Sequence, residues 1–193
     1  LDQEPSGVLP IATGMMPDSS KNYVSNYLGH TISVMCGQYP KIACNPGQKI
    51  KDIDLLLNTN TNYNPVTGVI SGPIGGFSVQ TPVSPDGKFV IQGNTLTGTI
   101  TIIDTATDTL VKMIACDPGC HGVNYGAKKG GGYYAYVSSK FSNRMLVVDP
   151  DPNGDGNPAD AKVVGSILLT ANNKTAKDGT ISEYAGMGGL GVL

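Results

Sequence analysis

Hydrophobic and polar positions in the middle of the chain alternate with the period of two that is typical of β-strands. Residues 99–103 read Thr-Ile-Thr-Ile-Ile, in which β-branched polar and apolar side chains alternate. Before them, residues 84–87 have the turn sequence Ser-Pro-Asp-Gly, in which Pro fixes φ and Gly supplies a positive φ. Strands over 88–92 and 109–115 complete a unit that the pattern predicts to be a β-sheet with one buried face.

The same order of turn, strand, turn and strand recurs on both sides of this unit. Residues 17–34 repeat it upstream and residues 136–149 repeat it downstream. The segment Lys-Ile-Ala-Cys-Asn-Pro-Gly at 41–47 also parallels Met-Ile-Ala-Cys-Asp-Pro-Gly at 113–119. A four-stranded propeller blade takes about 40–45 residues. The interval from Thr31 to Thr99 is longer than that, which predicts an insertion between the first two copies.

The residues that repeat resemble a known consensus. The string Ser-Pro-Asp-Gly, a strand ending in Asn, a turn and then Thr-Ile-Thr-Ile-Ile-Asp resembles the repeat of the YVTN β-propellers. That family includes surface-layer proteins and the N-terminal propellers of nitrous-oxide reductases. The resemblance implies an all-β fold, a β-propeller built of four-stranded antiparallel blades.

The repeat divides the chain into about three blades and part of a fourth, within a single partial propeller domain over 1–193. The predicted segments are blade A at 10–44, an insertion at 45–75, blade B at 76–116, blade C at 121–169, and the start of a next blade at 170–193. In blade A the inner strand is expected at 10–16 and the outer strand at 40–43. In blade B the inner strand is expected at 76–83. Propellers close with about four to eight blades, so we expect the rest of the ring to come from the remainder of a larger propeller or from other protein chains.

Composition agrees with this fold and excludes two classes of partner. The 193 residues include 26 Gly and 13 Pro and are 15% charged, which suits short strands and tight turns. The net charge is −2, and Arg144 is the one arginine of the sequence. The chain therefore has no basic face for nucleic acid. No run of 18 apolar residues is present, so we expect no membrane span.

Residues 149–160 have the spacing of a calcium-binding loop. Oxygen-bearing side chains occupy positions 1, 3 and 5, Gly follows at 6, and a carboxylate closes the loop at 12. Three prolines exclude the flanking helices of an EF-hand. The alternative is an Asx-rich hairpin turn without metal. The tentative calcium ligands are Asp149, Asp151, Asn153, Asp155 and Asp160, with a structural role.

Four cysteines lie as two local pairs in the sequence, Cys36 with Cys44 and Cys116 with Cys120, and spacing favours these among the three pairings that four cysteines allow. An even number of cysteines in a Gly-rich all-β chain favours disulfides and an extracellular, cell-surface or periplasmic location. The first pair is uncertain, because a regular outer strand at 40–43 would carry Cys44 too far away. The sequon at Asn173 agrees with export.

The two histidines, His30 and His121, map to one end of the blades, together with both long connections. Loops on a rigid scaffold carry function, so this end is the expected working face. Imidazole suits copper, and the resemblance to nitrous-oxide reductase propellers implies such a site, although that site needs many histidines. Haem is a weaker alternative, because Cys116 and Cys120 are one residue too far apart for Cys-x-x-Cys-His.

Neighbouring positions supply no Ser-His-Asp set and no pair of catalytic carboxylates. The leading hypothesis is therefore an exported, non-catalytic propeller that acts as a binding or assembly module of a cell-surface or periplasmic complex. The alternative is a segment of a copper- or haem-dependent redox enzyme, with its site on the face that carries His30 and His121.

Overall fold

The computed structural model describes residues 4–56, 64, 66–142, 144–168, 174–175 and 181–182. The described residues are β-strands and turns with one short 3-10 helix, η1 (Pro158–Asp160). They contain no helix long and apolar enough to cross a bilayer. The all-β prediction is confirmed.

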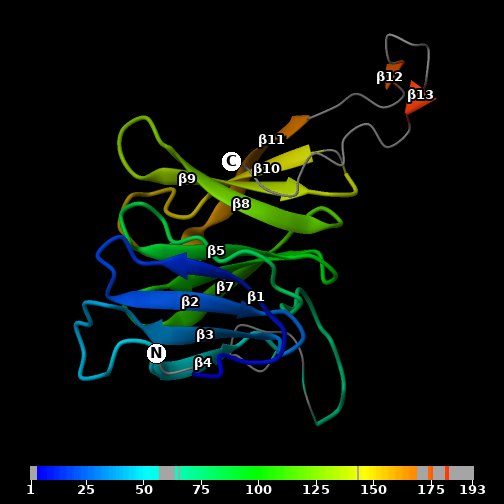
Figure 1. Ribbon diagram of the computed structural model, residues 1–193. Helices are drawn as coiled ribbons and strands as arrows, with labels where there is room; N and C mark the ends of the chain where they lie inside the picture. The colour runs from blue at the N-terminus through cyan, green and yellow to red at the C-terminus, as the bar shows by residue number, and fades with distance from the viewer. Residues whose placement is uncertain are drawn as a thin grey trace.

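Three antiparallel sheets lie face to face in chain order (Figure 1). Blade A contains β1 (Pro10–Met15), β2 (Lys21–Asn26), β3 (Thr31–Cys36) and β4 (Lys49–Asp54). Blade B contains β5 (Phe89–Asn94), β6 (Thr99–Asp104) and β7 (Thr109–Ala115). Blade C contains β8 (Cys120–Ala127), β9 (Tyr133–Ser139), β10 (Arg144–Asp149) and β11 (Lys162–Leu168). A separate pair is formed by β12 (Lys174–Thr175) and β13 (Ile181–Ser182).

The outer strand of blade A corrects the sequence-based prediction. Residues 40–43 are not a strand, and β4 pairs with β3 instead, with Ile32 opposite Ile53. Ile53 is 3% exposed in this pairing, whereas Ile42 of the expected strand is 52% exposed. The outer strand therefore lies inside the segment predicted as an insertion.

The same correction removes one of the apparent repeats. The Cys-Asp-Pro-Gly turn at 116–119 follows the outer strand of blade B, whereas Cys-Asn-Pro-Gly at 44–47 precedes the outer strand of blade A. The two turns are alike locally, and Gly47 and Gly119 both have a positive φ of 86° and 83°. They nevertheless occupy different places in their blades.

The inner strand of blade B is also less regular than predicted. Two isolated bridges, Ser78 with Asn94 and Val83 with Val90, join residues 76–83 to β5. No continuous strand forms there. Blade B is therefore a three-stranded sheet with a bridged inner segment.

The core consists of two layers, one on each side of blade B. One cluster lies between blades A and B and includes Tyr23, Ile32 and Val90. The other lies between blades B and C and includes Ile91 and Val137. Neighbouring residues of a strand point to opposite faces, so β5 contributes to both layers. Apolar side chains of the strands in all three blades are buried in this way: Val24, Ile32, Val34, Val90, Ile100, Ile102, Val137, Leu146 and Val148.

The same hydrogen-bond pattern recurs at the end of a middle strand in blade A and in blade B. Asn94 Nδ2 donates to Thr99 Oγ1 at 2.9 Å and to Thr101 Oγ1 at 2.7 Å. Asn26 Nδ2 donates in the same way to Thr31 Oγ1 at 3.0 Å and to Ser33 Oγ at 2.8 Å. In blade C the equivalent register position is Ser139, opposite Arg144. The asparagine thus ties two middle strands together across the turn that joins them.

Candidate functional site

The connections between strands gather at two opposite ends of the blades. The β2–β3 turn with His30 and the start of β8 with His121 lie at one end, here called the histidine face. The β1–β2, β6–β7 and β10–β11 connections lie at the other end, here called the aspartate face because it carries Asp18, Asp108 and Asp149. Sequence reasoning placed function on the histidine face, and the aspartate face carries a buried polar cluster and a groove that it did not name.

His30 takes part in a strained local contact. Its Nδ1 accepts a hydrogen bond from the Phe77 backbone N–H at 3.4 Å, and the two rings meet edge to face with centroids 4.5 Å apart. Both residues have a positive φ, 53° and 54°. His121 belongs to β8, so blade B separates the two histidines along the stack.

No group of three or more His, Cys, Asp or Glu side chains is arranged to hold a metal ion within the described ranges. The structure does not bring His30 and His121 into one cluster with other ligands. Copper on the histidine face remains a prediction.

Both local disulfides are present, Cys36–Cys44 and Cys116–Cys120, with Cα atoms 6.2 Å and 6.3 Å apart. The first can form because residues 37–47 are a loop and not the regular strand that sequence reasoning placed at 40–43. A cysteine in a disulfide cannot also form the thioether bond that covalent haem requires. The haem alternative therefore needs the second disulfide to be open.

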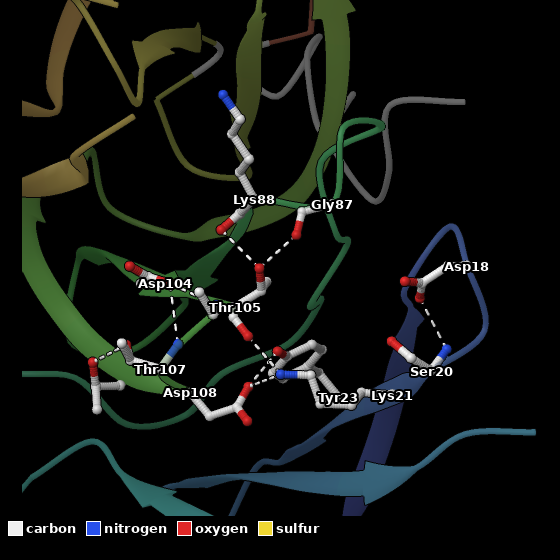
Figure 2. A network of polar contacts seen from close by, with 12 residues as sticks. Asp18, Ser20, Lys21, Tyr23, Gly87, Lys88, Asp104, Thr105, Thr107 and Asp108 are labelled. Carbon is white, nitrogen blue, oxygen red and sulfur yellow. Dashed lines mark hydrogen bonds and ion pairs between the residues drawn. The ribbon is translucent and has the colours of Figure 1, made fainter. Parts of the chain in front are cut away.

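A polar cluster joins blades A and B at the aspartate face (Figure 2). Asp108 Oδ1 accepts hydrogen bonds from the Tyr23 hydroxyl at 2.5 Å and from Lys21 Nζ at 2.7 Å. Lys21 Nζ also donates to the Thr105 carbonyl oxygen at 2.5 Å. The Thr105 hydroxyl in turn donates to the carbonyl oxygen of Gly87 at 2.5 Å. This set is called the Asp108 cluster, and it links strand β2 of blade A to two turns of blade B.

Burial makes the Asp108 cluster electrostatically strong. Tyr23 is 0% exposed, and the Lys21 and Asp108 side chains are 16% and 13% exposed. Burial raises the pKa of Tyr23 far above its ordinary value, and the neighbouring Asp108 carboxylate raises it further. The Tyr23 hydroxyl therefore stays protonated as a donor. This arrangement can hold two blades in register.

Asp18 makes a different kind of contact nearby (Figure 2). Its Oδ1 accepts from the Ser20 backbone N–H at 3.0 Å, and its carboxylate forms an ion pair with Lys41. Hydrogen bonding from Lys41 holds the pKa of Asp18 well below its usual range. The Lys41 side chain is 74% exposed, so solvent screens this pair and it contributes little to stability.

A groove of about 370 Å³ lies between blades B and C on the same face. Its walls are the Ser-Pro-Asp-Gly turn of blade B, residues 128–133 and residues 149–154. The Lys88 backbone oxygen accepts from Thr105 Oγ1 at 2.9 Å, while the Lys88 side chain extends away from the Asp108 cluster (Figure 2). Lys88 lines the groove, so the two polar features are continuous.

The loop with calcium-like spacing forms the wall of this groove on the side of blade C. Several of its carboxylates accept hydrogen bonds from backbone N–H groups of the loop itself. Asp151 Oδ2 accepts from Gly156 N at 2.9 Å, and Asp155 Oδ1 accepts from Asn157 N at 2.7 Å. Asp149 Oδ1 accepts from Asp151 N at 3.2 Å. The loop is thus a series of Asx turns, and calcium binding stays a prediction.

Blade C has an outward sheet face that is apolar and incompletely buried. Register places Tyr136 opposite Val147 and Met145 opposite Ile167, so these four side chains share the face turned away from blade B. Ile167 is 42% exposed, and the other three are half-buried. A Cβ at Gly126 would lie 2.7 Å from Tyr136 Cε2, so glycine allows the tyrosine ring to lie against β8. This set is called the outward face of blade C.

The outer side of blade A differs from the outward face of blade C, because a segment of the chain runs along it. Residues 4–9 run along its outer side, where the Ser33 hydroxyl donates to the Ser6 carbonyl oxygen at 2.6 Å and Tyr27 N donates to the Leu9 carbonyl oxygen at 3.0 Å. A Cβ at Gly7 would come within 2.5 Å of the Asn26 side chain, so the close approach requires glycine there. The first blade is covered in part by its own lead-in.

Sequence reasoning missed the polar groups that join separate turns. It named neither Lys128, which reaches Asp149, nor the Lys21–Tyr23–Asp108 contact. The signal in the sequence was weak, because the partners in each contact are far apart in the chain and no local spacing connects them.

No protein-family model and no curated protein sequence matches the chain. Solved structures do match. Kuenenia stuttgartiensis hydrazine synthase is 18% identical with a TM-score of 0.53, covering 77% of this chain and 34% of that one. A putative 6-phosphogluconolactonase from Bacteroides fragilis is 18% identical with a TM-score of 0.57, covering 88% and 41%. The RRP9 WD40 repeats are 15% identical with a TM-score of 0.51, covering 72% and 34%.

The chain spans less than half the length of each of these structures. At such low identity the likeness concerns the fold alone. Together with the stacked antiparallel sheets, it shows that the described residues form a blade-based segment of a β-propeller.

Proposed function

We propose that the chain is an exported, non-catalytic β-propeller module of the YVTN type, which assembles with a further blade through the outward face of blade C. The partner blade belongs either to the remainder of a larger propeller or to another chain of a cell-surface or periplasmic complex. The observation that carries this proposal is the partly exposed apolar surface formed by Tyr136, Met145, Val147 and Ile167.

That surface has the chemistry of the two layers already buried in the molecule. The layers on both sides of blade B are made of aliphatic and aromatic side chains from facing sheets. The outward face of blade C presents the same residue classes without a described partner sheet. Contiguous exposed apolar surface marks interaction sites in proteins. A blade-like sheet is the partner that matches its shape and chemistry.

The two disulfides support an oxidising compartment. All four cysteines are paired, and such pairs persist mainly in secreted, periplasmic and surface proteins. Because each disulfide joins residues close in sequence, it stabilises a local turn.

Thiol labelling tests the proposed interface. Since all four native cysteines are paired, a cysteine introduced at Met145 provides a single reactive thiol on the outward face of blade C. Phe141→Cys is the matched control, because Phe141 is 66% exposed in the adjacent β9–β10 turn. Each variant is labelled with a maleimide, once as the purified dilute chain and once in the assembly isolated from its producing cells.

We expect Met145→Cys to react in the purified chain and to be protected in the native assembly. Phe141→Cys should react in both. Equal labelling of Met145→Cys in the two preparations would contradict the proposed interface. Recovery of the native protein from the cytoplasm with four free thiols would contradict export. It would not change the conclusion about the interface that the labelling of Met145→Cys gives.

A further inference from the structure

Tyr136 occupies the position in blade C that Tyr23 occupies in blade A. Tyr23 pairs with Val34 across β2 and β3, and Tyr136 pairs with Val147 across β9 and β10. Each tyrosine lies three residues before the last residue of its strand. Tyr23 belongs to the layer between blades A and B, so this position faces the next blade along the chain.

In blade A this position is joined to blade B through the turn that precedes β7. The Tyr23 hydroxyl donates to Asp108 Oδ1 at 2.5 Å, and Asp108 is the residue directly before β7 (Figure 2). Tyr23 is 0% exposed, and buried tyrosine hydroxyls usually have a hydrogen-bond partner. The tyrosine of one blade thus meets an aspartate at the start of the outer strand of the next blade.

The contact between blades B and C has an apolar pair at the same two positions. Ile91, three residues before the end of β5, replaces the tyrosine, and Ala161, directly before β11, replaces the aspartate. Both are buried in the hydrophobic cluster between these blades. The two positions therefore match in chemistry at each interface, tyrosine with aspartate and isoleucine with alanine.

We propose that the blade covering the outward face of blade C has a carboxylate directly before its outer strand, and that this carboxylate accepts a hydrogen bond from the Tyr136 hydroxyl. This inference rests on the proposed assembly function, because it specifies the chemistry of the partner blade. It adds a requirement that apolar packing alone does not impose.

The Tyr136 hydroxyl is available for such a contact. Tyr136 is half-buried, and its hydroxyl makes no hydrogen bond within the part of the chain that the structure describes. The ring lies against β8, where a Cβ at Gly126 would be 3.5 Å from the hydroxyl oxygen. A further blade would cover this oxygen, and a covered hydroxyl without a partner is destabilising. The covering blade must therefore supply an acceptor.

A backbone carbonyl is the other acceptor that a buried tyrosine can use. The Tyr125 hydroxyl donates to the carbonyl oxygens of Pro82 and Phe89 at 3.2 Å and 3.4 Å. Tyr125, however, belongs to the inner strand β8, whereas Tyr23 and Tyr136 belong to second strands. The register position favours the carboxylate, and the carbonyl is the alternative that the test must exclude.

Carbodiimide cross-linking tests for this carboxylate, because the reagent joins a lysine to a carboxylate that it contacts. Lys21 lies two residues before Tyr23, and its Nζ is 2.7 Å from Asp108 Oδ1, so this pair is an internal positive control. Tyr134 has the same place relative to Tyr136. Tyr134→Lys therefore puts an amine within reach of the expected carboxylate.

Tyr133→Lys is the matched control, because neighbouring residues of a strand point to opposite faces. Each variant is treated in the assembly isolated from its producing cells, and the cross-linked peptides are identified by mass spectrometry. We expect Tyr134→Lys to be joined to an aspartate or glutamate directly before the outer strand of the covering blade. Tyr133→Lys should give no link to that blade, and the Lys21–Asp108 link should appear in both variants.

Tyr136→Phe provides a second measurement, because it removes the hydroxyl and keeps the ring. Combined with Met145→Cys, it should raise the rate of maleimide labelling in the assembly about tenfold, which corresponds to about 1.4 kcal/mol. The control is Tyr39→Phe combined with Met145→Cys, since Tyr39 is 69% exposed in blade A. This control should leave the labelling rate unchanged.

Failure of this inference differs from failure of the proposed function. If Met145→Cys is protected but Tyr134→Lys gives only the Lys21–Asp108 link, a blade covers the face without the carboxylate and the inference is wrong. An unchanged labelling rate with Tyr136→Phe would also overturn it. Equal labelling of Met145→Cys in the purified chain and the assembly would remove the interface itself. If Tyr134→Lys does not fold, the labelling rate of Tyr136→Phe decides.

Discussion

Asp108 has two roles: its backbone conformation closes a turn, and its carboxylate contacts the neighbouring blade. It adopts a φ of 53°, a conformation that Asp and Asn tolerate better than most residues. That conformation closes the turn between β6 and β7, and the carboxylate then receives Tyr23 and Lys21 from another blade. A single aspartate therefore ends one hairpin and positions it against the neighbouring sheet.

The substitution Asp108→Asn separates these two roles, because asparagine keeps the turn conformation and removes the charge. Lys21 then loses its counter-ion in a largely buried position. We expect the free energy of unfolding to fall by about 1.5–3 kcal/mol, the value of a hydrogen bond to a charged group. Denaturant unfolding measures this change. The control is Asp86→Asn in an exposed turn, which should stay within about 0.5 kcal/mol of the unaltered chain. An equal effect of both variants would contradict the proposed role.

At the scale of the strand pair, an asparagine at the end of β2 and of β5 makes the same hydrogen bonds to the next strand. Asn94 is 0% exposed and bonds two threonine hydroxyls of β6, and Asn26 does the same for β3 with Thr31 and Ser33. Each side chain donates to two hydroxyl oxygens of the neighbouring strand, and Asn94 is the one hydrogen-bond partner of Thr101 Oγ1 among the described residues. These asparagine hydrogen bonds therefore help to fix the register of the two middle strands.

Replacing Asn94 by alanine leaves Thr99 Oγ1 and Thr101 Oγ1 without this donor. Unsatisfied buried polar groups cost about 1–3 kcal/mol each, so we expect a loss of about 2 kcal/mol in the free energy of unfolding. Amide hydrogen exchange of the β5–β6 hairpin should accelerate as well. Asn45→Ala, at an exposed loop position, is the control. Unchanged exchange in the hairpin of Asn94→Ala would show that register is set elsewhere.

In the whole molecule, blade B is shared by two hydrophobic layers. Val90, Ile103 and Leu110 face blade A, whereas Phe89 and Ile91 face blade C. Loss of either layer therefore exposes one side of the same sheet. This arrangement couples the stability of the two outer blades through the middle one.

We accordingly expect Ile32→Ala, in the layer between A and B, and Leu146→Ala, in the layer between B and C, to shift one common unfolding transition. Each should cost about 2–5 kcal/mol, as large-to-small substitutions in cores do. Tyrosine fluorescence and far-UV circular dichroism should give the same midpoint for each variant. Two separate transitions in either variant would mean that the blades unfold independently.

The sequence by itself predicted the strands and turns of the central repeat at 84–115, because these depend on short-range chemistry. Alternation at 99–103 predicts a strand wherever the chain folds as β, and Gly87 has the positive φ that its turn sequence requires. Strand order in blade C also follows from consecutive hairpins.

Only the tertiary structure decided which distant segments pair. The outer strand of blade A is β4 and not residues 40–43, because β3 buries Ile53 by pairing there. Tyr23 and Asp108 are 85 positions apart, and no local spacing connects them. Lys128 likewise reaches Asp149 only because two turns of one blade end side by side. Periodicity is a property of neighbouring residues, whereas burial and charge pairing depend on the packed sheets.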